Sequence, residues 1–183
     1  KEADIEAVSD KIVEKVTKGG QAPATGCVPE GIPGYAASTA VQYDPDEARR
    51  LLAEAGYPNG IEINMEAPNT APFVNIAQSM QASMAAGGVK LNINAAETKT
   101  VISKYRAREH EIALIYWGPD YMDPHTNADG FAMNPDNSDD AKGKPLAWRN
   151  SWFDESVNNM TKAAVRERDG AKREQLYKDL QKK

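Results

Sequence analysis

The chain has 183 residues, and its 27 acidic residues outnumber its 22 lysines and arginines, which gives a formal net charge of −5. A hydrophobic fraction of 40% with 27% charged residues fits a globular domain and excludes disorder. The acidic charge disfavours nucleic-acid binding, which depends on clustered Lys and Arg. The longest apolar run, Ile112 to Trp117, is far shorter than a membrane-spanning helix. Cys27 is the only cysteine, so an internal disulfide and a Cys-rich metal site are excluded.

The sequence pattern of the first 43 residues predicts one helix followed by one long loop. Apolar residues at spacings of three and four form a helical stripe that Gly19 and Gly20 end; they are Ile5, Val8, Ile12 and Val16. Residues 20–43 contain several prolines and glycines, which prevent a regular strand or helix. Because this segment also carries apolar residues, we expect a loop ordered by packing; these residues are Val28, Ile32, Tyr35 and Val41.

The clearest helix start lies at Asp44. An Asp at the cap position, Pro45 at the first helical position and Glu47 at the third satisfy free amide groups and favour the positive end of a helix. Gly56, followed by Tyr57-Pro58, predicts that this helix ends in a left-handed residue.

Residues 61–117 alternate between strand and helix patterns. Strands are predicted from Ile61 and from Val89, where apolar and polar residues alternate, and helices are predicted after each of them. The run from Ile112 to Trp117 is apolar at every position, which predicts an interior strand. The fold class is therefore α/β, with an open mixed or mostly parallel sheet flanked by helices and a βαβαβ core at 61–117. Two amphipathic C-terminal helices are expected at 153–183, the first using Phe153, Val157, Met160 and Ala164.

The segment after this last strand is the candidate binding site. Open parallel sheets bind ligands beyond the carboxyl ends of their strands. Six aspartates and no Lys or Arg occur between Asp120 and Asp140, which favours a cationic ligand. Trp117 beside Asp120 would offer an ammonium group a flat apolar wall and a charged acceptor. The alternative interpretation makes Trp117 a core residue and the aspartates turn formers.

Two other functions are compatible with these residues. His125 with Asp123 and Asp129 could form the site of a metal-dependent hydrolase, although one histidine among loop carboxylates is a weak metal signal. The acidic loop could instead recruit a basic protein partner. No catalytic triad or phosphate-binding glycine loop is present, so we predict no catalytic residues, no metal, no cofactor and no enzyme activity.

The chain resembles a known family in the order and spacing of several motifs. These are "YDPDEARRLLAEAGYPNG", "SMQASMAAGGVKLNI" and above all "WGPDYMDP". They are similar to the second, C-terminal lobe of the extracytoplasmic solute-binding proteins of the peptide and opine class, family 5, that serve ABC importers. The resemblance implies a two-lobed periplasmic binding protein fold of type II, with the ligand held between the lobes. Residues 1–183 would then be a single lobe, a fragment of a larger protein.

The resemblance also implies roles for residues of the "WGPDYMDP" motif. Asp120 would accept the α-amino group of a peptide, and Trp117 would line the side-chain pocket. Gly118, Tyr121 and Asp123 belong to the same turn, where Asp123 would shape the loop before Pro124 by bonding nearby amides.

The implied partners follow from the same family. They are a small-molecule ligand (an oligopeptide, a dipeptide or an opine-like compound), the missing N-terminal lobe and an ABC transporter permease, with no nucleic acid. The implied location is periplasmic or lipid-anchored and extracytoplasmic.

Overall fold

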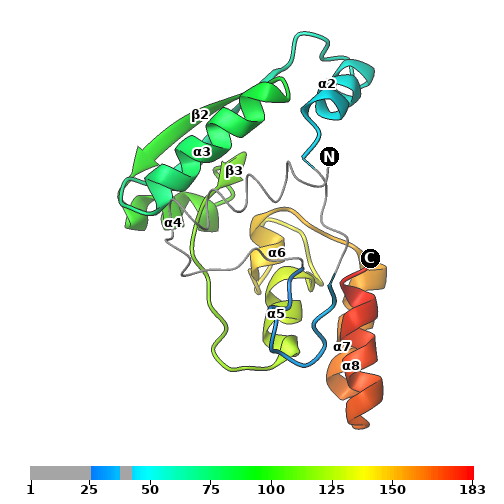
Figure 1. Cartoon of the computed structure of the whole chain (residues 1–183). Helices are drawn as coiled ribbons and strands as arrows, with labels where there is room; N and C mark the ends of the chain where they lie inside the picture. The colour runs from blue at the N-terminus through cyan, green and yellow to red at the C-terminus, as the bar shows by residue number, and fades with distance from the viewer. Residues whose placement is uncertain (1–25, 38–42) are drawn as a thin grey trace. The chain divides into compact units, whose positions relative to one another are not determined.

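The computed structural model describes residues 26–37 and 43–183, so the helix predicted at residues 5–16 and parts of the loop at 20–43 lie outside the described residues. The described chain forms two compact units (Figure 1). The first consists of residues 43–116. The second consists of residues 26–37 and 117–183.

The first unit is built on a parallel sheet. Strand β1 (Ile61–Pro68) lies between β2 (Val89–Ala96) and β3 (Ile112–Ala113), and it is parallel to both. The register pairs Ile61 with Val89, and Met65 with Ile112. The predicted parallel α/β sheet is therefore confirmed.

The prediction of an interior strand at Ile112–Trp117 is wrong for the described residues. The middle strand is β1, whereas β3 lies at an edge and has only two residues. One further bond, from the Leu114 amide to the Glu66 carbonyl (2.9 Å), continues the pairing. The next amide of β1 that faces β3 would belong to residue 68, and Pro68 has no N–H to donate, so the ladder stops after the Leu114–Glu66 bond.

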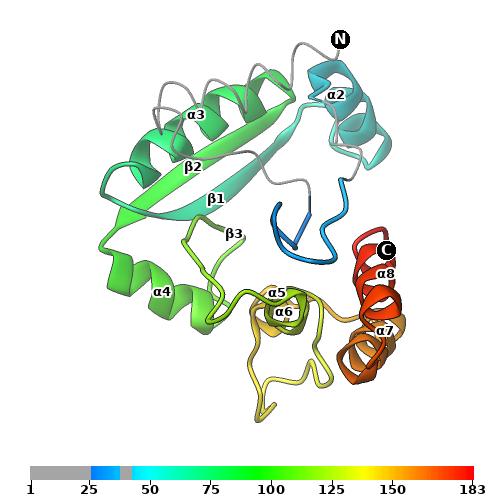
Figure 2. The same cartoon turned by 60° about the horizontal axis from the view of Figure 1, so that its bottom comes forward.

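Helix α3 (Phe73–Ala86) covers the apolar face of this sheet (Figure 2). The buried core there consists of Met65, Ala67, Ala77 and Leu91. Half-buried residues surround it; they are Ile63, Met80, Met84, Ile93, Ile112 and Leu114. The alternation of apolar residues along β1 and β2 thus places one face of each strand under α3, as a half-buried strand requires.

The opposite face of the sheet is polar. Its side chains come from alternate positions of the two long strands; they are Glu62, Asn64, Glu66, Lys90, Asn92 and Asn94. Glu66 is 5% exposed, and its two carboxylate oxygens accept hydrogen bonds from Asn94 (2.9 Å) and from Lys104 (2.8 Å) on α4 (Thr98–Arg106). Burial alone would raise the pKa of Glu66, but the bonds from Lys104 and Asn94 outweigh it and hold the pKa below its usual value.

The outer edge of β2 carries a side-chain cap. The carbonyl of Gly88 accepts from the Ile61 amide and that of Ala96 from the Asn69 amide, so the carbonyls of even-numbered residues point toward β1. Because successive carbonyls of a strand point to opposite sides, those of the odd-numbered residues of β2 point away from β1. The side-chain amide of Gln81 donates to one of them, the Leu91 carbonyl, at 2.6 Å.

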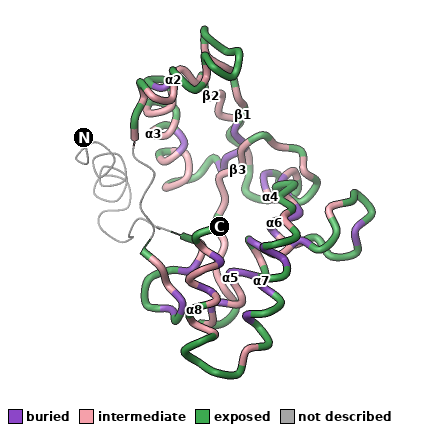
Figure 3. Tube along the Cα trace, turned by 90° about the vertical axis from the view of Figure 1, so that its right-hand side faces the viewer, coloured by how far each residue is buried: buried purple, intermediate pink, exposed green. Residues whose placement is uncertain are grey.

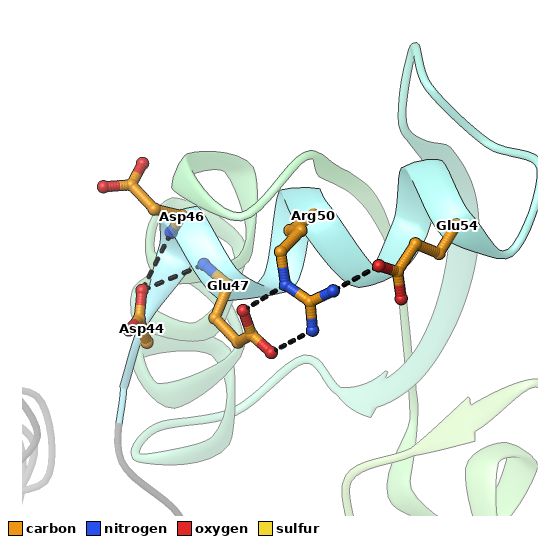
Figure 4. A network of polar contacts seen from close by, with 5 residues as sticks. All are labelled: Asp44, Asp46, Glu47, Arg50 and Glu54. Carbon is orange, nitrogen blue, oxygen red and sulfur yellow. Dashed lines mark hydrogen bonds and ion pairs between the residues drawn. The ribbon is translucent and has the colours of Figure 1, made fainter.

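Helix α2 (Pro45–Glu54) begins as the sequence predicts (Figure 4). The Asp44 carboxylate accepts from the backbone amides of Asp46 (3.1 Å) and Glu47 (2.9 Å). Arg50 binds Glu47 one turn earlier, with bonds of 2.6 and 2.5 Å. The helix contains no buried residue, so its caps and surface ion pairs supply much of its local order.

The second unit is helical. Its helices are α5 (Pro124–Phe131), α6 (Leu146–Arg149), α7 (Glu155–Arg166) and α8 (Gly170–Leu180). Figure 3 shows their buried positions in purple. One cluster of buried residues joins α5, α7 and α8; it consists of Ala128, Ala132, Val157, Ala164, Tyr177 and Leu180. Two helices, α7 and α8, lie within 153–183, where C-terminal helices are expected, but Phe153 precedes α7 and is 51% exposed, so it does not belong to the inner face.

Residues 26–37 pack against α8. Val28 is buried and its amide donates to the Gln181 side chain (3.2 Å), which in turn donates to the Gly34 carbonyl (2.6 Å). Gly34 has a φ of +88°, and a Cβ there would lie 2.9 Å from the Cβ of Tyr177. Residues 26–37 are therefore held by packing and hydrogen bonds, in the way expected of an ordered loop. No helix in the described ranges is long and apolar enough to span a membrane.

Candidate ligand-binding site

The candidate site is the segment from Trp117 to Asp123, which leads directly into α5. Trp117 is half-buried, and its ring packs edge-on against Phe131, with ring centroids 4.9 Å apart and planes at 79°. Gly130 lies under the same ring, since a Cβ there would be 3.7 Å from Trp117 Cζ2. Trp117 is thus supported by the end of α5 on one side and remains partly accessible. It is neither a fully buried core residue nor a fully exposed wall for a ligand.

Asp120 stands in the middle of this segment. The residue is exposed, and its carboxylate makes no hydrogen bond or ion pair with any residue of 26–37 or 43–183. Its oxygens can therefore accept bonds from a ligand without first breaking bonds to the protein.

The carboxylate of Asp123, unlike that of Asp120, is held by hydrogen bonds within the protein. One of its oxygens caps α5 by accepting from the His125 amide at 2.8 Å, as predicted for a residue that shapes the turn. The guanidinium of Arg173 on α8 also binds it through two bonds, Nη2 to Oδ1 at 2.7 Å and Nη1 to Oδ2 at 3.0 Å. The bonds from Arg173 hold the pKa of Asp123 below its usual value. A direct role of Asp123 in ligand binding stays a prediction, and its contacts are those of a residue that fixes the loop.

The residues between these two aspartates turn outward. Tyr121 is 56% exposed, and the next residue, Met122, is also exposed. The backbone carbonyl of Tyr121 is held from within the loop, because it accepts from the Asp123 amide (2.9 Å) and from the Thr126 hydroxyl (3.3 Å). Gly118 is half-buried between Trp117 and the exposed part of the loop.

The residues proposed for a metal site do not come together. Asp123 is engaged by Arg173, and Asp129 is exposed. No group of three His, Cys, Asp or Glu side chains with the spacing of a metal site occurs in the part of the chain that the structure describes. Farther along the acidic loop, Asp136 accepts from the amide (3.0 Å) and hydroxyl (2.6 Å) of Ser138, so it acts as a turn former.

Arg173 is the site residue that the sequence did not reveal. It lies 50 positions from Asp123, and α8 carries two other basic residues, Lys172 and Lys178, so the sequence gives no reason to single it out. One local signal was available: Arg173 and Tyr177 are four residues apart on a helix, and the guanidinium lies over the Tyr177 ring at 5.0 Å from its centroid.

Several curated relatives and solved structures match most of the chain. The chain is 31% identical over 171 residues to Di/tripeptide-binding protein 4 of Pseudomonas aeruginosa, covering 89% of this chain and 30% of that protein. It is 27% identical over 179 residues to the Glutathione-binding protein GsiB of Pectobacterium atrosepticum, covering 95% of this chain and 34% of that protein. The chain therefore spans about a third of the length of these relatives.

The fold matches the structure of the ABC transporter-associated periplasmic binding protein DppA from Helicobacter pylori, in complex with the peptide STSA. The TM-score is 0.83 and the identity 26%, over 95% of this chain and 33% of that chain. The model of the "Bacterial extracellular solute-binding proteins, family 5 Middle" matches residues 9–139, which is more than half of the chain. The chain belongs to the family 5 bacterial extracellular solute-binding proteins.

Proposed function

We propose that this chain is the C-terminal lobe of a two-lobed receptor that captures a peptide, or another amine-bearing solute, for an ABC importer. The observation that carries the proposal is the contrast between two nearby aspartates. Asp123 is fully engaged by Arg173 and the start of α5, whereas Asp120 has an exposed carboxylate beside a supported Trp117.

This arrangement suits an ammonium group. The Asp120 carboxylate would accept charge-assisted hydrogen bonds from the ammonium, and the accessible part of Trp117 would contact the carbon atoms next to it. A cation near a tryptophan face gains roughly 0.5 to 2 kcal/mol, most when water is excluded. A second lobe closing over the segment would exclude that water and strengthen both interactions.

The names of the relatives support this class of ligand, since they bind dipeptides, tripeptides or glutathione. Each of these solutes carries a free amino group. Membership of an extracellular solute-binding family supports an extracytoplasmic location, with an ABC transporter permease as the receiving partner. An opine-like ligand is the second candidate for the same site because it also presents charged nitrogen and carboxylate groups.

The test compares a free and a blocked amino group. Titration calorimetry of the full-length receptor with tri-alanine and with N-acetyl tri-alanine measures how much affinity depends on the ammonium. We expect Asp120→Asn to weaken tri-alanine binding by about 30-fold to several thousand-fold, because removing one member of a buried charge pair costs about 2 to 5 kcal/mol. The same variant should leave the weaker binding of the acetylated peptide nearly unchanged.

Asp129→Asn is the matched control. Asp129 is an exposed aspartate on α5, so its substitution removes the same charge without touching the Trp117–Asp123 segment. Equal tri-alanine affinities for the wild type, Asp120→Asn and Asp129→Asn would remove Asp120 from the site and contradict the proposed function.

A further inference from the structure

We infer that Arg173 is a positioning residue for the binding site, because it fixes the Trp117–Asp123 segment in the conformation that presents Asp120. This inference rests on the proposed function and adds to it a residue from a distant helix. The observations that carry it are the contacts at the two ends of the segment.

Arg173 is itself held in place by α8. Its guanidinium lies over the ring of Tyr177, which is completely buried, and Nη2 lies 3.4 Å from the Tyr177 hydroxyl oxygen. The side chains of Arg173 and Asp123 are 26% and 31% exposed, so water screens their interaction less than that of a surface pair. Arg173 therefore offers Asp123 a fixed fork of two donors rather than a mobile charge.

The pairing determines where both carboxylate oxygens of Asp123 point. Oδ1 accepts from Arg173 and from the His125 amide, while Oδ2 accepts from the second Arg173 nitrogen. The side chain is thus fixed in the position that caps α5. A lysine at position 173 would keep the charge but lose the planar pair of donors.

The backbone carries this constraint toward Asp120. The amide of Asp123 donates to the carbonyl of Tyr121, the residue directly after Asp120, and the Thr126 hydroxyl donates to the same carbonyl. At the other end, the Trp117 ring is fixed against Phe131. Asp120 lies between these two attachments and makes no hydrogen bond or ion pair of its own with residues 26–37 or 43–183, so its position depends on the attachments.

The experiment measures amine selectivity, defined as the affinity of the full-length receptor for tri-alanine divided by that for N-acetyl tri-alanine. If Arg173 positions Asp120, Arg173→Met should lower this ratio by about tenfold, a size typical of coupled neighbouring residues. Arg173→Lys should give an intermediate ratio. A loss of general stability would instead weaken both peptides equally and leave the ratio unchanged.

Lys178→Met is the matched control. Lys178 lies on the same helix and pairs with Glu174 at 2.6 Å, so this variant also removes one cation and one ion pair from α8. Its amine selectivity should equal that of the wild type. A fall as large as that of Arg173→Met would show that any charge loss on α8 acts on the site, and would contradict the inference.

Hydrogen exchange without ligand provides a second, independent measurement. Amides of residues 117–125 should exchange faster in Arg173→Met than in Lys178→Met. Unchanged exchange and selectivity in Arg173→Met, with a lower selectivity in Asp120→Asn, would overturn the role of Arg173 and leave the proposed function intact. Faster exchange with no effect of Asp120→Asn would contradict the proposed function and retain the structural role of Arg173.

Discussion

The side-chain amide of Asn158 forms two hydrogen bonds with the backbone of Asn134. The Asn158 side chain accepts from the Asn134 backbone amide at 2.7 Å and donates to the Asn134 backbone carbonyl at 2.8 Å. Both residues are buried, with 0% and 3% of their surface exposed. The side chain of Asn158 thus pairs with the N–H and C=O of Asn134 as the backbone of a neighbouring strand would. It links the chain after α5 to α7.

Loss of this bridge should destabilise the protein. We expect Asn158→Ala to lower the free energy of unfolding by about 2 to 4 kcal/mol, because it leaves a buried N–H and a buried C=O without partners. Asn159→Ala, at the exposed neighbouring position of α7, should change it by less than about 0.5 kcal/mol. Urea unfolding of both variants measures the difference; identical midpoints would show that water replaces the bridge at no cost.

Glu66 should make stability depend on acidic pH. Its pKa is lower in the folded protein than in the unfolded chain, where glutamate titrates near roughly 4.3. The stabilisation is therefore fully present above the unfolded pKa and is lost as the pH falls through the folded pKa. Glu66→Gln should flatten the fall in unfolding free energy between about pH 5 and pH 3. Glu97→Gln, at an exposed position, should retain the steep fall of the wild type.

The chain alone should bind the ligand poorly. A ligand held between two lobes makes only part of its contacts with one of them, while the cost of association remains several kcal/mol. Calorimetry of the 183-residue chain with tri-alanine should give a dissociation constant no tighter than about 1 mM. Submicromolar binding would mean that one lobe suffices and would contradict the two-lobed proposal.

Local chemistry made most of the first unit predictable. The Asp44-Pro45 start of α2 and the left-handed Gly56 after it, with a φ of +93°, depend on residues adjacent in sequence. The same signature recurs at Asp123-Pro124, where it begins α5. The sequence predicts the cap bonding of Asp123 there, but the helix that follows is not apparent from it, because the following residues are polar and show little helical periodicity.

Long-range geometry could not be predicted in the same way. The length of β3 is limited by Pro68 of β1, which has no N–H to continue the ladder, and this depends on the register rather than on the apolar run itself. The engagement of Asp123 depends on Arg173, which reaches the loop because α8 packs against α5 and α7. The sequence therefore indicated the motif, and tertiary packing assigned different contacts to its two aspartates.

The cap on the outer edge of β2 has a consequence for self-association. Exposed strand edges can recruit a strand from another molecule and begin aggregation. Here the Gln81 amide already occupies the Leu91 carbonyl, and Lys90 adds a charge to the same strand. An incoming strand would have to displace the Gln81 amide and desolvate that charge, so this edge resists intermolecular β-pairing while the protein is folded.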